Sequence, residues 1–212
     1  KRLGHAALDT VVPIARDEAA DKAGLFRGAM RRITTLLVIA YFFHMLMFYF
    51  LLKWIPKIVV DLGYEPSSAG SVLVWANIGG VTGSLLFSYL TTRLPLRGLL
   101  IGVFAFSFLA LVWFGMNATG LGELKTAAAL VGFFANAGVV GLYALVAASY
   151  PAHLRAGGTG LVIGLGRGGA AAGPAVAGFL FVGGFGLPLV ALMMGVGSLV
   201  AAGAIFALRS PP

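Results

Sequence analysis

The 212-residue sequence has little charge and no cysteine. Only 10% of its residues are charged, 59% are hydrophobic, and the mean hydropathy is +0.97. A soluble domain carries about 25% charged residues, so this chain could not cover a soluble surface with polar groups. The absence of cysteine excludes disulfides and thiolate metal sites. The composition therefore predicts an integral membrane protein, with the lipid bilayer as its surroundings.

Motifs for catalysis are missing as well. The sequence has no Walker A loop, no paired His/Glu metal site and no cysteine nucleophile. We therefore predict no enzymatic activity, catalytic residue, metal or cofactor. Gly164-Leu-Gly-Arg-Gly-Gly169 is superficially like a dinucleotide fingerprint, but it lies inside an apolar stretch and no strand precedes it. The net charge of +8 does not predict nucleic-acid binding, because the basic residues outside the first 32 are scattered singly.

Six apolar stretches are long enough to cross a membrane. A helix needs roughly 20 mostly apolar residues to span the hydrocarbon core. The runs are continuously apolar and do not alternate with a period of two, which favours helices over barrel strands. The predicted fold is all-α, with six transmembrane helices at residues 33–52, 69–90, 98–116, 126–150, 158–182 and 187–208.

The basic residues predict the orientation of these spans. Eleven Lys and Arg residues fall on one side of the predicted bundle, and only Lys53, Lys57 and Lys125 fall on the other. The positive-inside rule places the larger group and both termini in the cytoplasm, and we expect a bacterial inner (plasma) membrane. Residues 1–30 mix acids and bases and predict a cytoplasmic connector, with a short interfacial helix near residues 25–32 as the alternative. Residues 31–209 would form the helix bundle.

Arg167 is the main candidate for a functional residue. It lies within the fifth predicted span, roughly 13 Å from the cytoplasmic end of that span. A guanidinium in a span is costly and usually faces a bundle interior or a water-filled cavity. It could bind a carboxylate with its planar fork of donors, or it could be a structural cation tied to backbone carbonyls. Glycines at 160, 164 and 168 would form a small-residue stripe for helix contact, and Gly173-Pro174 would permit a bend.

Other polar residues in the spans are weaker candidates for substrate binding. His44 could donate to substrate or act as a proton-linked switch, or it could only bond a neighbouring helix. Asn77 and Asn136 could line a pore or join helices, and Tyr143 could form part of an aromatic wall. None of the predicted spans contains a carboxylate. A proton-driven carrier usually needs a protonatable group in the membrane, so either His44 serves or that group lies on sequence outside this chain.

Several motifs resemble the major facilitator superfamily, and more narrowly its aromatic acid:proton symporter family. Residues 150–160 read Tyr-Pro-Ala-His-Leu-Arg-Ala-Gly-Gly-Thr-Gly and, with residues 164–169, resemble the family's tenth and eleventh helices. Residues 141–145 and the Lys-Trp-Ile-Pro of residues 53–56 fit as well. Gly79-Gly80, Gly83 and Arg93 resemble the cytoplasmic loop between helices eight and nine, although Thr92 stands where the family has Asp.

The resemblance implies the C-terminal six helices of a twelve-helix carrier. The expected function is proton-coupled symport of small organic, mainly aromatic, carboxylates by alternating access, with the proton as coupling ion. Arg167 would take part in substrate or structural coordination, and Arg93 and Arg155 would belong to a cytoplasmic gate. The partner would be a missing N-terminal half or a second copy of the chain. A carrier of a sugar, dicarboxylate or drug, and a non-transporting six-helix scaffold, are the alternatives.

Overall fold

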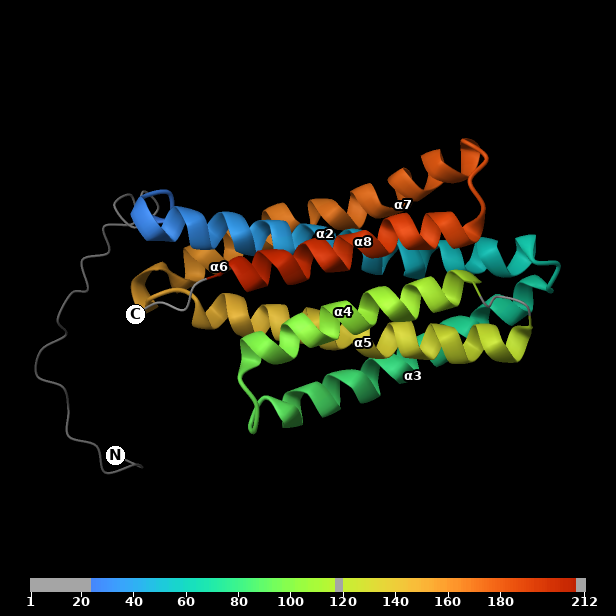
Figure 1. The fold of residues 1–212 in the computed structure, drawn as a ribbon, viewed down its shortest axis with the longest axis horizontal. Coiled ribbons are helices and arrows are strands. Elements are labelled where there is room, and N and C mark those ends of the chain that lie inside the picture. Colours follow the sequence, from blue (N-terminus) through green and yellow to red (C-terminus); the bar gives the residue numbers. More distant parts are fainter. Residues whose placement is uncertain (1–23, 117–119, 209–212) are drawn as a thin grey trace, which may run out of the picture.

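The computed structural model describes residues 24–116 and 120–208, which form helices joined by short turns (Figure 1). Six helical stretches of the described chain are long and apolar enough to span a membrane, which confirms the predicted all-α fold. The helices are α2 (Gly28–Asp61), α3 (Pro66–Leu90), α4 (Leu96–Met116), α5 (Leu121–Ala148), α6 (Ala152–Gly166), α7 (Gly168–Val182) and α8 (Leu187–Ala207). Most of the predicted connector lies outside the described residues.

Two of the helices differ from the sequence prediction. α2 continues past Lys53 and Pro56 to Asp61, because its last turns carry exposed polar residues and need not lie in hydrocarbon. The fifth span is divided into α6 and α7 at Arg167, where ψ is −16°. The sequence indicated that Gly173-Pro174 permits a bend, and in the structure α7 continues through Pro174. Glycines on both sides of Arg167 weaken the helix there, so the break comes earlier than the proline.

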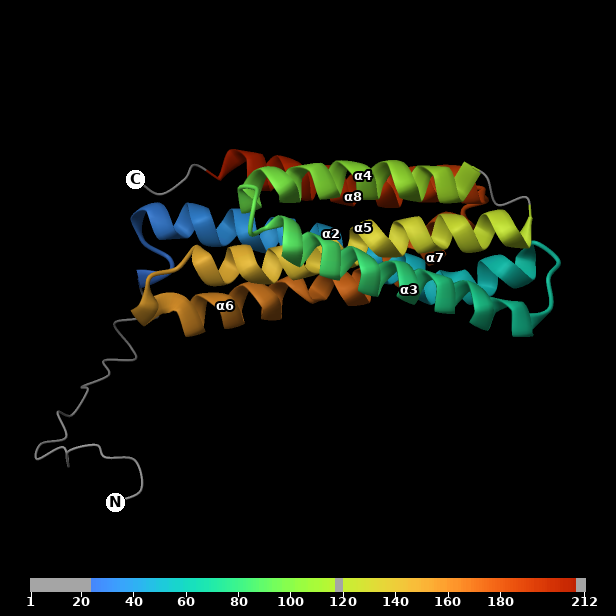
Figure 2. The same cartoon turned by 90° about the horizontal axis from the view of Figure 1, so that it is seen from below.

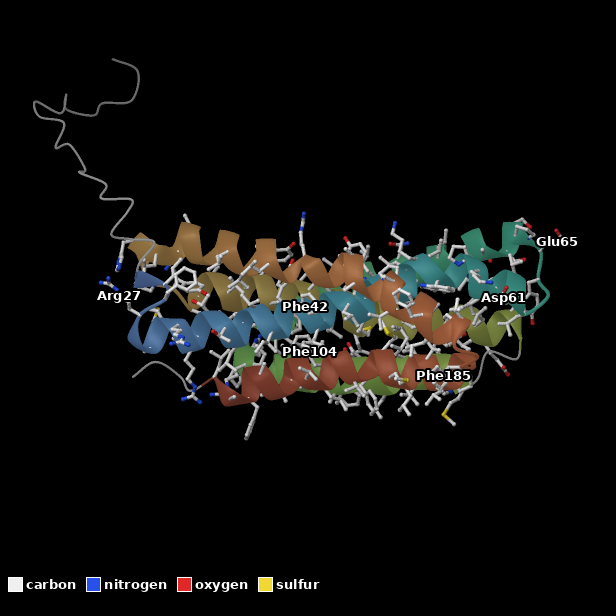
Figure 3. All side chains as sticks on the ribbon, turned by 90° about the horizontal axis from the view of Figure 1, so that it is seen from above. Arg27, Phe42, Asp61, Glu65, Phe104 and Phe185 are labelled. Carbon is white, nitrogen blue, oxygen red and sulfur yellow. The ribbon has the colours of Figure 1, made fainter. Side chains whose placement is uncertain are left out.

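The helices form three layers. Figure 2 shows α4 and α8 together on one side, α2 and α5 in the middle, and α3 and α6 on the other side. α3 packs mainly on α5, whereas α6 and α7 pack mainly on α2. Arg31, Arg32, Arg93, Arg97 and Arg155 gather at one end of the bundle, which we call the basic end. Asp61 and Glu65 lie at the far end, opposite Arg27 (Figure 3).

Glycines bring the main chains of neighbouring helices into direct contact. A Cβ atom added at Gly79 or Gly83 of α3 would overlap main-chain atoms of α5, and one added at Gly169 or Gly173 would overlap main-chain atoms of α2. Small residues allow this close approach in membrane bundles. Of the predicted contact stripe at residues 160, 164 and 168, only Gly168 meets α2, at the ring of Phe42. Gly160 and Gly164 face open space, and the contact stripe lies on the other side of the helix.

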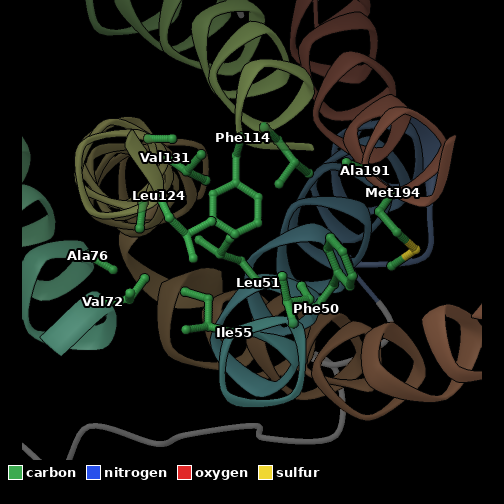
Figure 4. Packing of buried hydrophobic residues seen from close by; sticks show 14 of the residues in the cluster. Phe50, Leu51, Ile55, Val72, Ala76, Phe114, Leu124, Val131, Ala191 and Met194 are labelled. Atoms are coloured by element: carbon green, nitrogen blue, oxygen red, sulfur yellow. The ribbon is translucent and has the colours of Figure 1, made fainter. Parts of the chain in front are cut away.

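The hydrophobic core between the layers consists of two clusters of buried residues. Towards the far end, the ring of Phe114 from α4 lies among Leu124 and Val131 of α5 and Leu51 of α2 (Figure 4). A second cluster around Leu37, Tyr41, Phe104 and Val162 fills the half nearer the basic end. The α4–α8 layer thus joins α2 and α5 into one unit, and it leaves their other side to α3, α6 and α7.

Candidate functional site

Arg167 lies at the midpoint of the fifth span, between α6 and α7. α6 and α7 contain 15 residues each, so the guanidinium-bearing residue stands about 22 Å from either end of the span. Its side chain is exposed, together with Gly160, Gly164 and Ala171 on the same side of the helix. These four residues and Tyr143 of α5 define what we call the open face. A cation in the middle of an apolar span requires polar partners.

Two tyrosines supply those partners. The Tyr41 hydroxyl donates to the Tyr143 hydroxyl at 3.0 Å, and the two rings meet edge to face with centroids 5.9 Å apart. Arg167 lies near both hydroxyls and interacts with them electrostatically. Tyr41 is only 1% exposed, whereas Tyr143 is 38% exposed. The cluster therefore presents a guanidinium and one accessible hydroxyl, which are donors suited to a carboxylate.

Tyr41 reaches this cluster because Gly166 leaves room for its ring. A side chain at residue 166 would collide with the ring of Tyr41. The helix carrying Arg167 thus lies directly against α2 at the level of the two hydroxyls. Sequence analysis selected Arg167 and Tyr143 as candidates, and the structure brings them together. The sequence suggested an aromatic-wall role for Tyr41 as it did for Tyr143, but it gave no sign that Tyr41 lies beside Arg167.

His44 lies in the core and does not reach the open face. Its side chain is fully buried, and Nε2 lies 2.9 Å from the carbonyl oxygen of Ala135. A carbonyl only accepts, so Nε2 carries the proton in this bond. The ring also packs on Phe104 with centroids 4.8 Å apart. Nδ1 is buried without a hydrogen-bond partner among the described residues. This arrangement ties α2 to α5.

The two asparagines also lie away from the Arg167 cluster. Asn136 is half-buried, donates to the Gly132 carbonyl at 3.0 Å, and packs against Gly80 of α3. Asn77 is exposed on α3 and donates to the Leu73 carbonyl at 2.8 Å. Each side-chain amide therefore donates to a carbonyl of its own helix, and Asn136 also lies in the contact between α3 and α5. Among the described residues, no hydrogen bond joins either amide to the open face.

The arginines divide into two groups at the basic end. Arg93 and Arg155 are exposed, at the α3–α4 turn and in the first turn of α6. Arg32 and Arg97 instead donate to carbonyls in the last turn of α8, namely those of residues 205–207. Positive charge at a helix C-terminus interacts favourably with the helix dipole. Sequence reasoning did not find this second role, because the partner carbonyls lie more than 100 residues away.

The fold and the sequence place the chain in a known family. Residues 37–212 match the Major Facilitator Superfamily, and the chain belongs to this family of membrane transporters. The crystal structure of the Escherichia coli fucose:proton symporter FucP has the same fold, with a TM-score of 0.76 and 15% sequence identity. That likeness covers 91% of this chain and 46% of the symporter.

Several relatives are named as transporters of aromatic acids. The chain is 33% identical over 186 residues to the 3-(3-hydroxy-phenyl)propionate transporter of Escherichia coli K12, which covers 88% of the chain and 46% of the relative. It is 28% identical to the gallate transporter of Pseudomonas putida, over 86% of the chain and 41% of the relative. The chain thus spans less than half the length of these relatives. They are transporters, which agrees with the predicted absence of enzymatic activity.

Proposed function

We propose that this chain is the C-terminal half of a proton-coupled carrier for small aromatic carboxylates that works by alternating access. The observation that carries the proposal is the cluster of Arg167, Tyr41 and Tyr143 at the middle of the membrane span. Carriers of this family bind their substrate near the bilayer midplane, between two halves. Arg167 would bind the carboxylate, and the Tyr143 hydroxyl would donate a further hydrogen bond.

The substrate class is supported by the chemistry of the cluster and by the names of the relatives. A planar guanidinium binds both oxygens of a carboxylate, and the exposed ring of Tyr143 offers an aromatic wall beside it. Relatives of similar length to a twelve-helix carrier are named for hydroxyphenylpropionate and gallate. Both names denote an aromatic ring that bears a carboxylate, which is the pair of groups that this cluster suits.

The second half of the carrier would cover the open face. The chain spans less than half of its relatives, and its central cation lies on an exposed side of the bundle. An N-terminal six-helix half, or a second copy of the chain, would close the site from the other side. The basic end would face the cytoplasm of a bacterial inner membrane, since Lys and Arg are enriched there. Arg93 and Arg155 would then contribute to a cytoplasmic gate.

Uptake measurements test this function. The chain would be joined to the N-terminal half of the Escherichia coli 3-(3-hydroxy-phenyl)propionate transporter, and uptake of labelled 4-hydroxybenzoate would be followed in cells. We expect Arg167→Lys to lose most of the uptake, because an ammonium cannot replace the bidentate guanidinium. Arg27→Lys makes the same exchange at the end of the bundle and should leave uptake unchanged. Equal uptake by both variants would refute the role of Arg167.

A further inference from the structure

A cavity lies at the far end, between α2 and α7. It has a volume of about 540 Å³, and its lining includes Trp54, Lys57 and Asp61 from α2 and Gly178, Phe179 and Phe181 from α7. The space is ample for a one-ring acid. It is separate from the Arg167 cluster, because Gly178 stands about 16 Å further along the span than Arg167.

The aromatic wall of this cavity is held in place. The Trp54 indole N–H donates to the Pro174 carbonyl at 3.1 Å, and the indole lies against Phe181 with ring centroids 4.6 Å apart. Gly178 stands beside the indole and leaves room for it. Trp54 therefore has a fixed position between α2 and α7. Its ring is fixed on the wall of a cavity, with Phe179 exposed beside it.

The Lys57 ammonium in this cavity is accessible to other carboxylates. Lys57 Nζ lies 2.9 and 2.8 Å from the two carboxylate oxygens of Asp61, and the two side chains are 58% and 57% exposed. An exposed ion pair of this spacing contributes little, and the order Lys before Asp is the weaker one on a helix. A carboxylate arriving from solution can therefore take the place of Asp61 on Lys57 at small cost.

A line of exposed residues on α7, spaced four apart, connects this cavity to Arg167. Ala175 and Phe179 line or border the cavity, and Ala171 and Arg167 follow at spacings of four residues along the same exposed side of α7. Residues four apart lie one above the other on a helix. Only alanine side chains stand between the cavity and Arg167 on this stripe, so an organic anion would meet no bulky group along it.

We propose that this cavity is an outer capture site for aromatic carboxylates, which holds the ring against Trp54 and Phe179 and the carboxylate on Lys57 before the anion moves along α7 to Arg167. The proposal rests on the proposed function for its direction of transfer, but the binding step does not require transport. It assigns Lys57 and Trp54 to substrate recognition, a role that sequence analysis gave to neither residue.

Fluorescence of the purified chain in detergent tests the binding step. In a Trp75→Phe, Trp113→Phe background, Trp54 is the only tryptophan, and benzoate should quench its emission with saturation. Neutral benzamide, which has the same ring, should quench far less. Lys57→Gln should weaken benzoate binding about two- to five-fold, the size of one exposed charge pair. Asp61→Asn removes the competing carboxylate and should strengthen it. Equal quenching by benzamide, or an unchanged affinity in Lys57→Gln, would overturn the capture site.

Arg167→Gln separates this proposal from the proposed function. We expect this variant to keep the saturable quenching of Trp54 by benzoate, even though its uptake is lost in the joined carrier. Loss of quenching in Arg167→Gln would mean that the signal reports the central cluster, and it would overturn the outer site. If the joined carrier shows no uptake while quenching still depends on Lys57, the transport function fails and the outer anion site stands.

Discussion

The hydroxyl of Tyr41, buried on α2, donates to the hydroxyl of Tyr143 on α5 across 102 residues of sequence. Because that bond uses the Tyr41 proton, the more exposed Tyr143 keeps its own proton for another acceptor. The two residues are therefore not equivalent. Tyr41 positions its partner, whereas Tyr143 and Arg167 face the open side where a substrate would bind.

This difference predicts unequal effects of removing each hydroxyl. Tyr143→Phe should raise the KM for uptake by about two- to ten-fold, the size of one lost hydrogen bond, because it removes a group that would touch substrate. Tyr41→Phe should have a smaller effect in the same direction. Tyr49→Phe, on the same helix, serves as the control and should not change KM. A larger effect from Tyr41 than from Tyr143 would contradict this assignment.

Replacing glycine by alanine should change the stability of the bundle in different ways on the two sides of α6 and α7. Gly169→Ala and Gly173→Ala should destabilise the bundle by about 1–3 kcal/mol, because the added Cβ meets the main chain of α2. Gly160→Ala and Gly164→Ala face open space and should be neutral, or stabilising by about 0.5–1 kcal/mol. Thermal unfolding in detergent measures both pairs. Destabilisation by Gly164→Ala equal to that by Gly169→Ala would show that the helix packs differently.

The burial of His44 predicts that it does not set the pH dependence of uptake. His44→Gln keeps an amide donor that can reach the Ala135 carbonyl, but it removes the titratable group. We expect the joined carrier with this variant to retain the pH profile of the unchanged carrier. The measurement is the initial uptake rate across pH 5–8. A flat profile in His44→Gln would make this residue the proton-coupling group.

Tyr150 predicts a loss of stability at alkaline pH. Its hydroxyl donates to Thr34 at 2.9 Å in the turn between α5 and α6, and burial raises the pKa of Tyr150 above its usual value near 10. A pKa raised in the folded state favours the protonated form there. The resulting stability is fully present below pH of about 10 and is lost as pH rises towards the folded-state pKa.

Melting temperatures of the chain and of Tyr150→Phe check this expectation. The phenylalanine variant lacks the bond to Thr34, so it should be less stable at pH 8. The difference between the two proteins should shrink above pH of about 10, because the tyrosine at position 150 ionises there and a phenylalanine cannot, while all other titratable groups are shared. A constant difference from pH 8 to pH 11 would show that Tyr150 does not ionise on unfolding in this range.

The positions of the spans were predictable because the bilayer sets their length and hydropathy. Predicted and observed boundaries agree within a few residues for the second, third and sixth spans. The far end of α2 was missed, since its exposed lysines lie beyond hydrocarbon and carry no apolar signal. Pro174 was a stronger local signal for a bend than Arg167, but a proline stays inside a helix when the surrounding turns are well packed.

The partners of the candidate residues were less predictable. Composition identified Arg167 because a cation in an apolar span is rare, yet its contact with Tyr41 depends on which side of each helix faces the other. Glycines at four-residue spacing occur both on the side of Gly160 and on the side of Gly169. The sequence therefore could not show which of the two sides packs against α2. His44 was equally ambiguous, since a polar residue in a span can face either a cavity or a neighbouring carbonyl.

The contact of Gly169 and Gly173 with the main chain of α2 has a mechanical consequence. Interlocked side chains hold two helices at fixed steps, because a ridge must leave one groove before it enters the next. A backbone surface without protruding side chains presents no such steps. At these two positions the contact does not by itself fix the level of α7 along α2; the hydrogen bond from Trp54 to Pro174 and the ring of Tyr41 beside Gly166 do so, and they thereby hold Arg167 at its level in the span.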